Sequence, residues 1–282
     1  MAGDHPAITA KLTAWPVAGP LRPLLAVWND KQGRPAELDK MLDELVAAGD
    51  KDDQSAGRLG TALKQAMSKP SPARLQRALA LAAGPLTDRR TWTVLSAACE
   101  QGGFGFDQEW MAVQQYDQKL QQQGQGRMFR NNGEEQTDPA LAIPLAVVCT
   151  LLADRRTVPD DILKMQMNGD WGHIQIHGFS LSVQLREHGR NKKTEEAKPR
   201  PNPTALRVCD LTATAARNLS YQVGAHELGE VKVDLWAEAT ARDAAQRPIA
   251  EAFAEKARAA LTVAKLPDVL PAAAPTDAKA LF

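Results

Sequence analysis

The chain has 282 residues, 44% hydrophobic and 24% charged, a balance typical of one large or two modest globular domains. Lysine and arginine number 34, as do aspartate and glutamate, so the formal net charge is zero. Proteins that coat nucleic acid as their main task are usually basic, so the overall charge argues against that role but is compatible with a local basic patch.

The three cysteines, Cys99, Cys149 and Cys209, lie in apolar surroundings and form no C-x-x-C pair. We therefore expect no metal, no cofactor and no disulfide framework, but buried thiols in a reducing compartment. Residues 1–17 lack a basic segment followed by an apolar run, so we expect no secretory signal. The longest apolar run, residues 140–153, is too short to span a bilayer. We place the protein in the cytoplasm, with no membrane contact.

In chain order, the first predicted element is a half-buried strand over residues 7–14, where apolar and polar residues alternate. Apolar residues at helical spacing then predict amphipathic helices that pack as a bundle, over residues 35–48, 56–67, 71–84, 87–101 and 106–120. Residues 121–137 are polar and without a period, so they predict a loop.

A further helix is predicted over residues 139–153, with Asp138 as N-cap and a bend at Pro144. Residues 157–167 predict a short helix. From residue 171 the apolar period changes to two, which is typical of strands. Strands are expected over residues 171–187, 205–211 and 229–242, a short helix and turn over 212–227, and a final helix over 247–264.

These elements predict an α+β fold that is helix-rich. A bundle-like block over about 35–168 packs with a small antiparallel sheet formed by the N-terminal strand and strands from the C-terminal third. We expect one composite domain over residues 1–265 and a Pro/Ala-rich tail over 266–282. Within the domain, residues 20–168 form a helical subdomain, and residues 7–14 with 171–265 form an α/β subdomain.

The segment GHIQIHGFSLSVQL, residues 172–185, contains His173 and His177. In a strand these two histidines are roughly 13 Å apart, too far to share a metal ion. Apolar residues occupy even positions before Gly178 and odd positions after it. One continuous strand cannot do this and keep one face buried, so we expect a β-bulge or a sharp bend at His177 and Gly178.

The segment AHELGE, residues 225–230, resembles the zinc-protease pattern H-E-x-x-H only in its first half, because Glu230 stands where the second histidine belongs. We interpret it as a turn and expect no metal site there. Neither a phosphate-binding loop nor a nucleophile elbow is present. The catalytic candidates are His173, His177, His226 and Glu227.

Two predicted loops carry candidate contacts with nucleic acid or a protein partner. Residues 186–200 hold six cations against three carboxylates, a net of +3, and the cations are Arg186, Arg190, Lys192, Lys193, Lys198 and Arg200. In the loop at 121–137, cations accompany an aromatic side chain, as in single-stranded nucleic-acid binders: Arg127, Phe129 and Arg130. Charged loops are more often simply solvated.

Two hypotheses follow. The first is a non-enzymatic subunit or adaptor of a larger protein or protein–nucleic-acid assembly, which contacts protein partners, and in one version nucleic acid, through exposed basic and polar loops. The second is a hydrolase-like enzyme with a non-standard site that pairs His173, His177, His188 or His226 with a carboxylate. No small-molecule substrate is indicated. Catalytic sites assemble from residues distant in sequence, so missing motifs do not exclude an enzyme.

Overall fold

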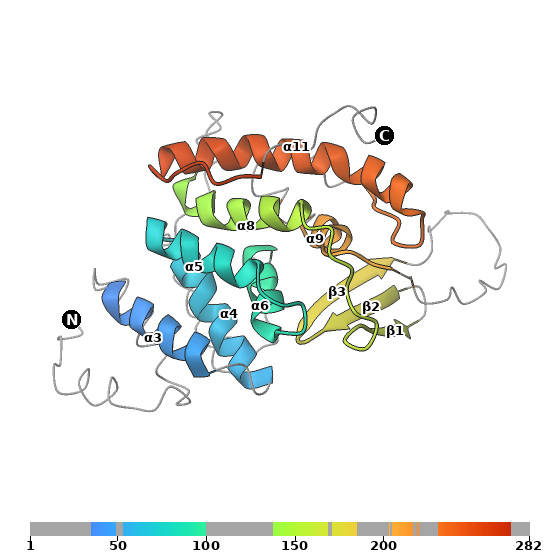
Figure 1. Ribbon diagram of the computed structural model, residues 1–282, viewed down its shortest axis with the longest axis horizontal. Coiled ribbons are helices and arrows are strands. Elements are labelled where there is room, and N and C mark those ends of the chain that lie inside the picture. Colours follow the sequence, from blue (N-terminus) through green and yellow to red (C-terminus); the bar gives the residue numbers. More distant parts are fainter. Residues whose placement is uncertain are drawn as a thin grey trace, which may run out of the picture.

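The computed structural model describes residues 35–48, 53–99, 138–168, 171–184, 203, 205–216, 219 and 231–271. Its helices are α3 (Pro35–Ala48), α4 (Asp53–Met67), α5 (Pro72–Ala82), α6 (Arg89–Cys99), η1 (Pro139–Leu141, a 3-10 turn), α8 (Ala142–Leu152), α9 (Val208–Ala215) and α11 (Ala239–Val263). The strands are β1 (Lys164–Asn168), β2 (Trp171–Ile176) and β3 (Phe179–Gln184). The predicted helix-rich α+β class with a small antiparallel sheet is confirmed (Figure 1).

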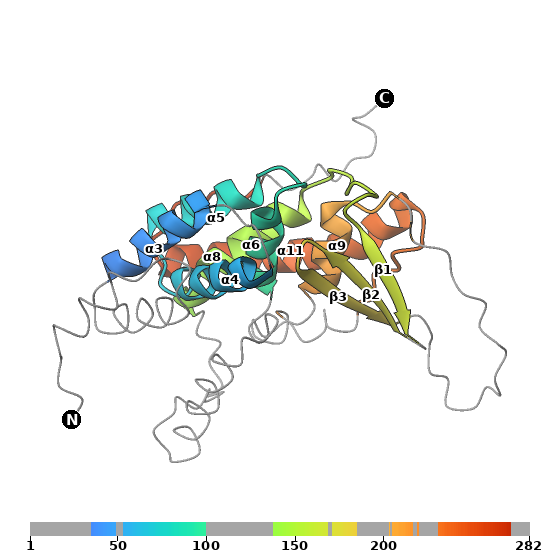
Figure 2. The same ribbon diagram turned by 90° about the horizontal axis from the view of Figure 1, so that it is seen from below.

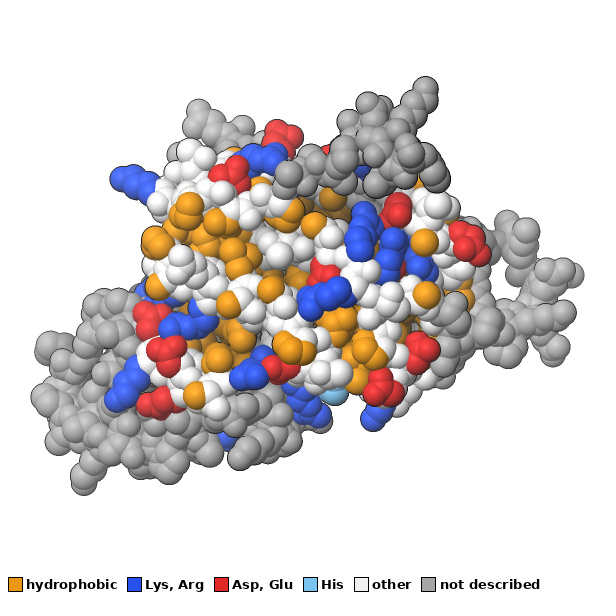
Figure 3. All heavy atoms as spheres, viewed as in Figure 1, with side chains coloured by type: hydrophobic (Ala, Val, Ile, Leu, Met, Phe, Trp, Pro, Cys, Tyr) orange, Lys and Arg blue, Asp and Glu red, His pale blue; other side chains and the backbone are white. Residues whose placement is uncertain are grey.

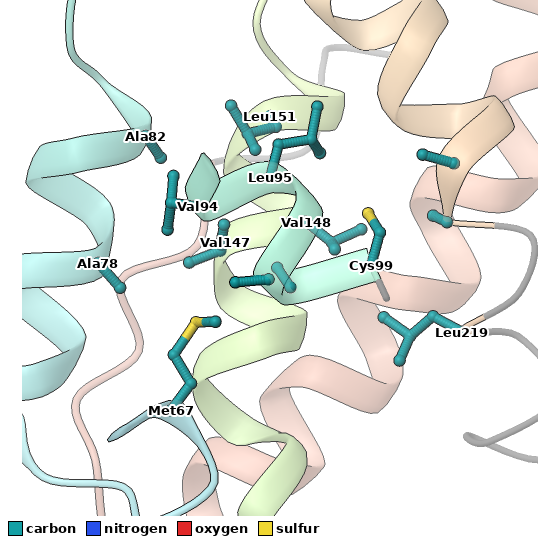
Figure 4. Close-up of a cluster of buried hydrophobic side chains, with 14 of the residues drawn as sticks. Met67, Ala78, Ala82, Val94, Leu95, Cys99, Val147, Val148, Leu151 and Leu219 are labelled. Carbon is teal, nitrogen blue, oxygen red and sulfur yellow. The ribbon is translucent and has the colours of Figure 1, made fainter. Parts of the chain in front are cut away.

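Helix α8 occupies the centre of the helical layer. It is apolar on all sides, and every one of its residues except Thr150 is buried, as expected of a helix that packs against neighbours all round. It contacts α11 on one side and α5 and α6 on the other (Figures 1 and 2). Val147 and Val148 of α8 lie against Val94 and Leu95 of α6 in this core (Figure 4).

Capping side chains fix several helix starts. Ser71 accepts a hydrogen bond from the backbone N–H of Arg74 at 3.3 Å, at the predicted start of α5. Asp138 caps its helix as predicted, although the first three residues form η1 before α8 begins. Helix α6 begins two residues later than predicted and is capped by Asp88, which accepts from the N–H of Arg90 at 2.9 Å.

The sheet is antiparallel with the order β1-β2-β3, and it packs against the helices through its apolar face. Ile174, Ile176 and Phe179 are buried on that face. Phe179 contacts Trp92 of α6 with ring centroids 5.8 Å apart, and the indole N–H of Trp92 donates to the carbonyl of Leu86 at 2.7 Å. This aromatic contact fixes the hairpin beside the start of α6.

The helix predicted over residues 157–167 is wrong. Residues 160–162 form a turn, and β1 begins at Lys164. In β1, Lys164 and Gln166 are exposed while Met165 is half-buried, which is the alternation of a strand. The five-residue strand is too short for its period to decide against a helix, and pairing with β2 decides it.

Two predicted C-terminal strands are also wrong. Residues 205–211 mostly belong to helix α9, and only an isolated bridge joins Arg207 to Thr157. Residues 231–238 are irregular, and α11 begins at Ala239, well before the predicted start at 247, and continues through Pro248. In the first turns of α11, Arg242 and Gln246 are buried, and Arg242 donates hydrogen bonds to the carbonyls of Leu235 and Ala205.

Other predictions fall partly or wholly outside the described residues. These are the strand at 7–14, the helix at 106–120 and the loops at 121–137 and 186–200. The domain boundaries stay a prediction, although buried apolar residues from Leu38 to Leu266 form one cluster. Across the described ranges, no helix combines the length and the apolar character that a membrane span requires.

The three cysteines are buried and form no disulfide with one another, in agreement with the prediction of buried thiols. Burial raises the pKa of the Cys149 thiol to about 12, and burial together with the charge of Asp210 raises that of Cys209. A raised pKa favours the protonated thiol, which is a weaker nucleophile than the thiolate.

Candidate functional site

Most of the candidate residues named from the sequence lie outside the described residues, and their roles stay predictions: Arg127, Phe129, Arg130, Arg186, His188, Arg190, Lys192, Lys193, Lys198, Arg200, His226 and Glu227. Of the candidate residues, only His173 and His177 lie within the described part of the chain. These two histidines lie in different surroundings, so they do not form one site.

His173 lies on the polar, outward face of the sheet. Its Nδ1 and the hydroxyl of Ser182, the cross-strand neighbour on β3, are 3.0 Å apart. A serine–histidine contact can activate a nucleophile when a third group orients the histidine. Within the described ranges His173 has no hydrogen bond to a carboxylate, and Ser182 is exposed on the open strand face. The contact is a polar cross-strand pair.

His177 occupies the turn between β2 and β3. The predicted break at His177 and Gly178 is confirmed, but it is a two-residue hairpin turn and neither a bulge nor a bend within one strand. Both residues have positive φ, 46° for His177 and 88° for Gly178, as a type I′ turn requires. The reversal of direction accounts for the change of apolar parity, because the two flanking residues Ile176 and Phe179 pair on one face.

The turn borders a hollow of about 420 Å³ between the sheet and the start of α6, here called the hairpin hollow. Its volume is in the range of small-molecule sites. Three parts of the chain line the hollow. The first is Arg89 at the start of α6, and the second is the segment that leads into β1, with Asp161, Ile162 and Lys164. The third is the hairpin around the turn, with Gln175, His177, Gly178, Phe179 and Ser180.

His177 lines this hollow, and one of its ring nitrogens has an unusual environment. Its Nε2 is buried and makes no hydrogen bond to any of the described residues. Burial, followed by the positive charge of Arg89, lowers the pKa of His177, and the carboxylates of Asp88 and Asp161 oppose this only in part. The imidazole is therefore neutral at pH 7, and one ring nitrogen can accept a hydrogen bond while the other donates.

The carboxylate of Asp88 is already engaged. The Nε of Arg90 donates to both of its oxygens, at 3.0 and 2.9 Å, and this contact keeps the pKa of Asp88 below its usual range. The charged side chains in the lining of the hollow are Arg89, Lys164 and Asp161.

A second charged cluster joins α9 to α11. Asp210 is fully buried and accepts hydrogen bonds from the Nη2 of Arg207 at 2.8 Å and from the side-chain amide of Gln246. The Nε of Arg242 lies 3.2 Å from Asp210 Oδ2, and Asp243 pairs with Arg207 at 2.8 Å. In Figure 3, Lys and Arg side chains lie beside Asp and Glu side chains on the right-hand side, where the start of α11 lies in Figure 1. The cluster has its charges paired internally, so we assign it a structural role.

Sequence reasoning missed Arg89, Lys164 and Asp161 as lining residues. Arg89 is separated from the hairpin by more than 80 residues, and no local pattern joins them. In the sequence, Asp161 is notable only because it is adjacent to Asp160, and two adjacent carboxylates are equally well explained by exposure to solvent. Among the described residues, no group of three histidine, cysteine, aspartate or glutamate side chains could hold a metal ion.

Comparisons with known proteins add nothing to this geometry. No protein-family model, no curated protein and no solved structure matches the chain.

Proposed function

We propose that the protein is a non-enzymatic cytoplasmic subunit or adaptor of a larger protein or protein–nucleic-acid assembly. The observation that supports this best is the outer edge of β1. In the described part of the chain β1 pairs with β2 alone, so its other side offers unpaired backbone groups. A strand edge of this kind is a template for pairing with an extended segment of another chain.

The register indicates which backbone groups face outward. The two-residue turn makes Ile176 and Phe179 a hydrogen-bonded pair, and such pairs alternate along antiparallel strands. The alternation directs the backbone of Gln175 and His173 toward β1, where their partners are Lys164 and Gln166. The N–H and C=O groups of Met165, between these two, therefore point away from the sheet.

The side chains of β1 indicate the chemistry of the partner. Lys164 and Gln166 are exposed on the polar face, whereas Met165 is half-buried on the apolar face. An added strand would continue both faces, so it would alternate apolar and polar residues. A carboxylate opposite Lys164 would form a favourable cross-strand pair. The proposed partner is thus an extended protein segment with an acidic residue at that position.

The test uses two variants of the same residue. Met165→Pro removes one outward N–H without removing a bond to β2, and proline is tolerated on edge strands. Met165→Leu keeps the N–H and the apolar side chain. Tagged protein purified from the native host should retain its partner in the wild type and in Met165→Leu and lose it in Met165→Pro. Equal retention by Met165→Pro, with unchanged circular dichroism, would contradict the proposal.

The nucleic-acid version of the proposal has its own test. It rests on the net charge of +3 over residues 186–200. Binding to single- and double-stranded DNA and RNA, measured across salt concentrations, should weaken steeply as salt rises. Changing Lys192, Lys193 and Lys198 to Glu should abolish it. The absence of salt-dependent binding would contradict the nucleic-acid version, and binding unchanged by the triple substitution would show that the basic segment is not the contact.

A hydrolase-like enzyme is the second candidate, and one observation favours it. His177 and Asp161 line the same hairpin hollow, as a base and a carboxylate would. Hydrolysis of model esters or phosphoesters by the purified protein, lost in His177→Gln, would support this candidate over the adaptor. Activity that survives His177→Gln would remove this hollow from consideration.

A further inference from the structure

Helix α11 runs along α8 and over α9, and Pro248 interrupts it (Figure 1). Proline has no N–H, so the carbonyl of Ala244 receives no helical hydrogen bond from position 248. Helices bend most often where a proline interrupts the hydrogen-bond ladder. Pro248 therefore divides α11 into a first segment, residues 239–247, and a second segment, residues 249–263.

The second segment is held by apolar packing. Ile249, Phe253 and Leu261 are almost fully buried, and they belong to the common apolar core. Burial of apolar surface is the dominant favourable contribution to folding. We therefore expect the second segment to leave its place only when the core itself unfolds.

The first segment is held by polar contacts. None of its side chains belongs to the apolar core that the described residues form, and its buried side chains are Arg242 and Gln246. Arg242 donates to the carbonyls of Leu235 and Ala205, both at 3.1 Å. Polar contacts of this kind replace contacts with water, so their net contribution is smaller than that of apolar burial.

Cys209 of α9 is buried at the contact between α9 and the first segment. Its Sγ lies 3.4 Å from Nη1 of Arg155, and the same nitrogen donates to Asp243 and Gln246 of the first segment. The side chain of Cys209 is fully buried. A reagent in the solvent therefore reaches the Cys209 thiol only when these contacts open.

We propose that the first segment of α11 separates from α9 as a unit, with Pro248 as the hinge, while the second segment stays packed on the core. The movement breaks the polar contacts of the first segment and uncovers α9 at Cys209. The fold thus contains a hinged element that exposes part of α9 without unfolding the core. This inference is independent of the proposed function, because it uses neither the edge of β1 nor the basic segment at 186–200.

The test measures the rate at which iodoacetamide alkylates Cys209 in the full chain, with mass spectrometry to follow each thiol. At urea concentrations below the unfolding transition, the rate at Cys209 should depend only weakly on urea, because opening of the first segment exposes little surface. Global unfolding exposes far more surface. A urea dependence at Cys209 as steep as that of global unfolding, measured by circular dichroism, would overturn the proposal.

Pro248→Ala tests the hinge without changing a charge. The variant restores an N–H for the carbonyl of Ala244, so opening of the first segment must also break this hydrogen bond. Alkylation of Cys209 should become about tenfold slower. Cys149 is the internal reference, since it is buried and senses the charge of Arg258 in the second segment. Its rate should not change, and an unchanged rate at Cys209 would overturn the proposal.

Asp243→Asn tests the polar contacts of the first segment. Loss of a partly exposed ion pair should make alkylation of Cys209 about two- to fivefold faster. The matched control is Asp268→Asn, which removes an ion pair with Arg258 of the second segment and should leave the rate at Cys209 unchanged. Equal acceleration at Cys209 in the two variants, or equal acceleration of Cys149 and Cys209 in Asp243→Asn, would contradict separate opening.

Discussion

At the scale of single residues, Asp210 is the most deeply buried charged side chain among the described residues. Burial opposes its ionisation, but hydrogen bonds from Arg207 and Gln246 outweigh burial and hold its pKa below the usual value. The backbone N–H of Arg207 also donates to it at 2.9 Å, which caps the start of α9. One carboxylate therefore joins a helix start to α11.

We expect Asp210→Asn to lower the free energy of unfolding by about 3 kcal/mol, because it leaves buried Arg242 without its counter-charge. The matched control is Asp243→Asn. The side chain of Asp243 is 40% exposed, so this substitution should lower the free energy of unfolding by less than about 1 kcal/mol. Urea unfolding measures both variants. Equal losses would mean that the buried carboxylate contributes no more than the exposed one.

The same group has a signed pH dependence. The pKa of Asp210 is lower in the folded state than in the unfolded state, so its contribution is complete above the unfolded value of about 4 and is lost as pH falls toward the folded value. In wild type, stability should decline below about pH 4 more steeply than in Asp210→Asn. Parallel pH profiles of the two proteins would contradict this assignment.

At the scale of elements, the backbone conformation of the hairpin turn, and not a lack of space for a side chain, accounts for the glycine at position 178. A Cβ added at Gly178 would meet no atom within 4 Å, yet the φ of +88° is strained for any L-residue. Gly57 in α4 has equally open space and a helical backbone. The two glycines therefore separate conformational strain from steric contact.

Gly178→Ala should destabilise the protein by about 1–2 kcal/mol, the cost of a left-handed conformation. Gly57→Ala should stabilise it by about 0.5–1 kcal/mol, through helix propensity. Thermal unfolding of the two variants and the wild type measures both signs. Two changes of the same sign would show that the turn does not have the positive φ described here.

At the scale of the whole molecule, the contact of Trp92 with Phe179 joins the helical layer to the sheet. Both side chains are almost fully buried. Trp92→Ala should lower the free energy of unfolding by about 3–5 kcal/mol. Trp92→Phe keeps a ring against Phe179 but loses the hydrogen bond to Leu86, and should cost about 1–2 kcal/mol. Denaturant unfolding tests both, and a similar loss in the two variants would assign the stabilisation to the hydrogen bond.

The sequence predicted the secondary structure correctly wherever a pattern was long or chemically specific. Helices α3, α4 and α5 were predictable because apolar stripes of three turns or more coincide with Ser-Pro and glycine signals. It failed for β1, α9 and the start of α11, where runs of five to eight residues fit either period. In the candidate site, His177 was found through the parity change at Gly178, whereas Arg89 and Lys164 carried no local signal.

The sequence by itself therefore determined the class of fold, the main helices and the break in the hairpin, because hydrophobic periodicity and glycine act over neighbouring residues. Only the tertiary structure decided that the break is a turn, that β1 lies at the edge of the sheet formed by the described residues, and that Arg89, Lys164 and His177 line one hollow. Those facts depend on pairing and packing between distant segments. Local propensities are too weak to specify them, since burial in the common core outweighs them.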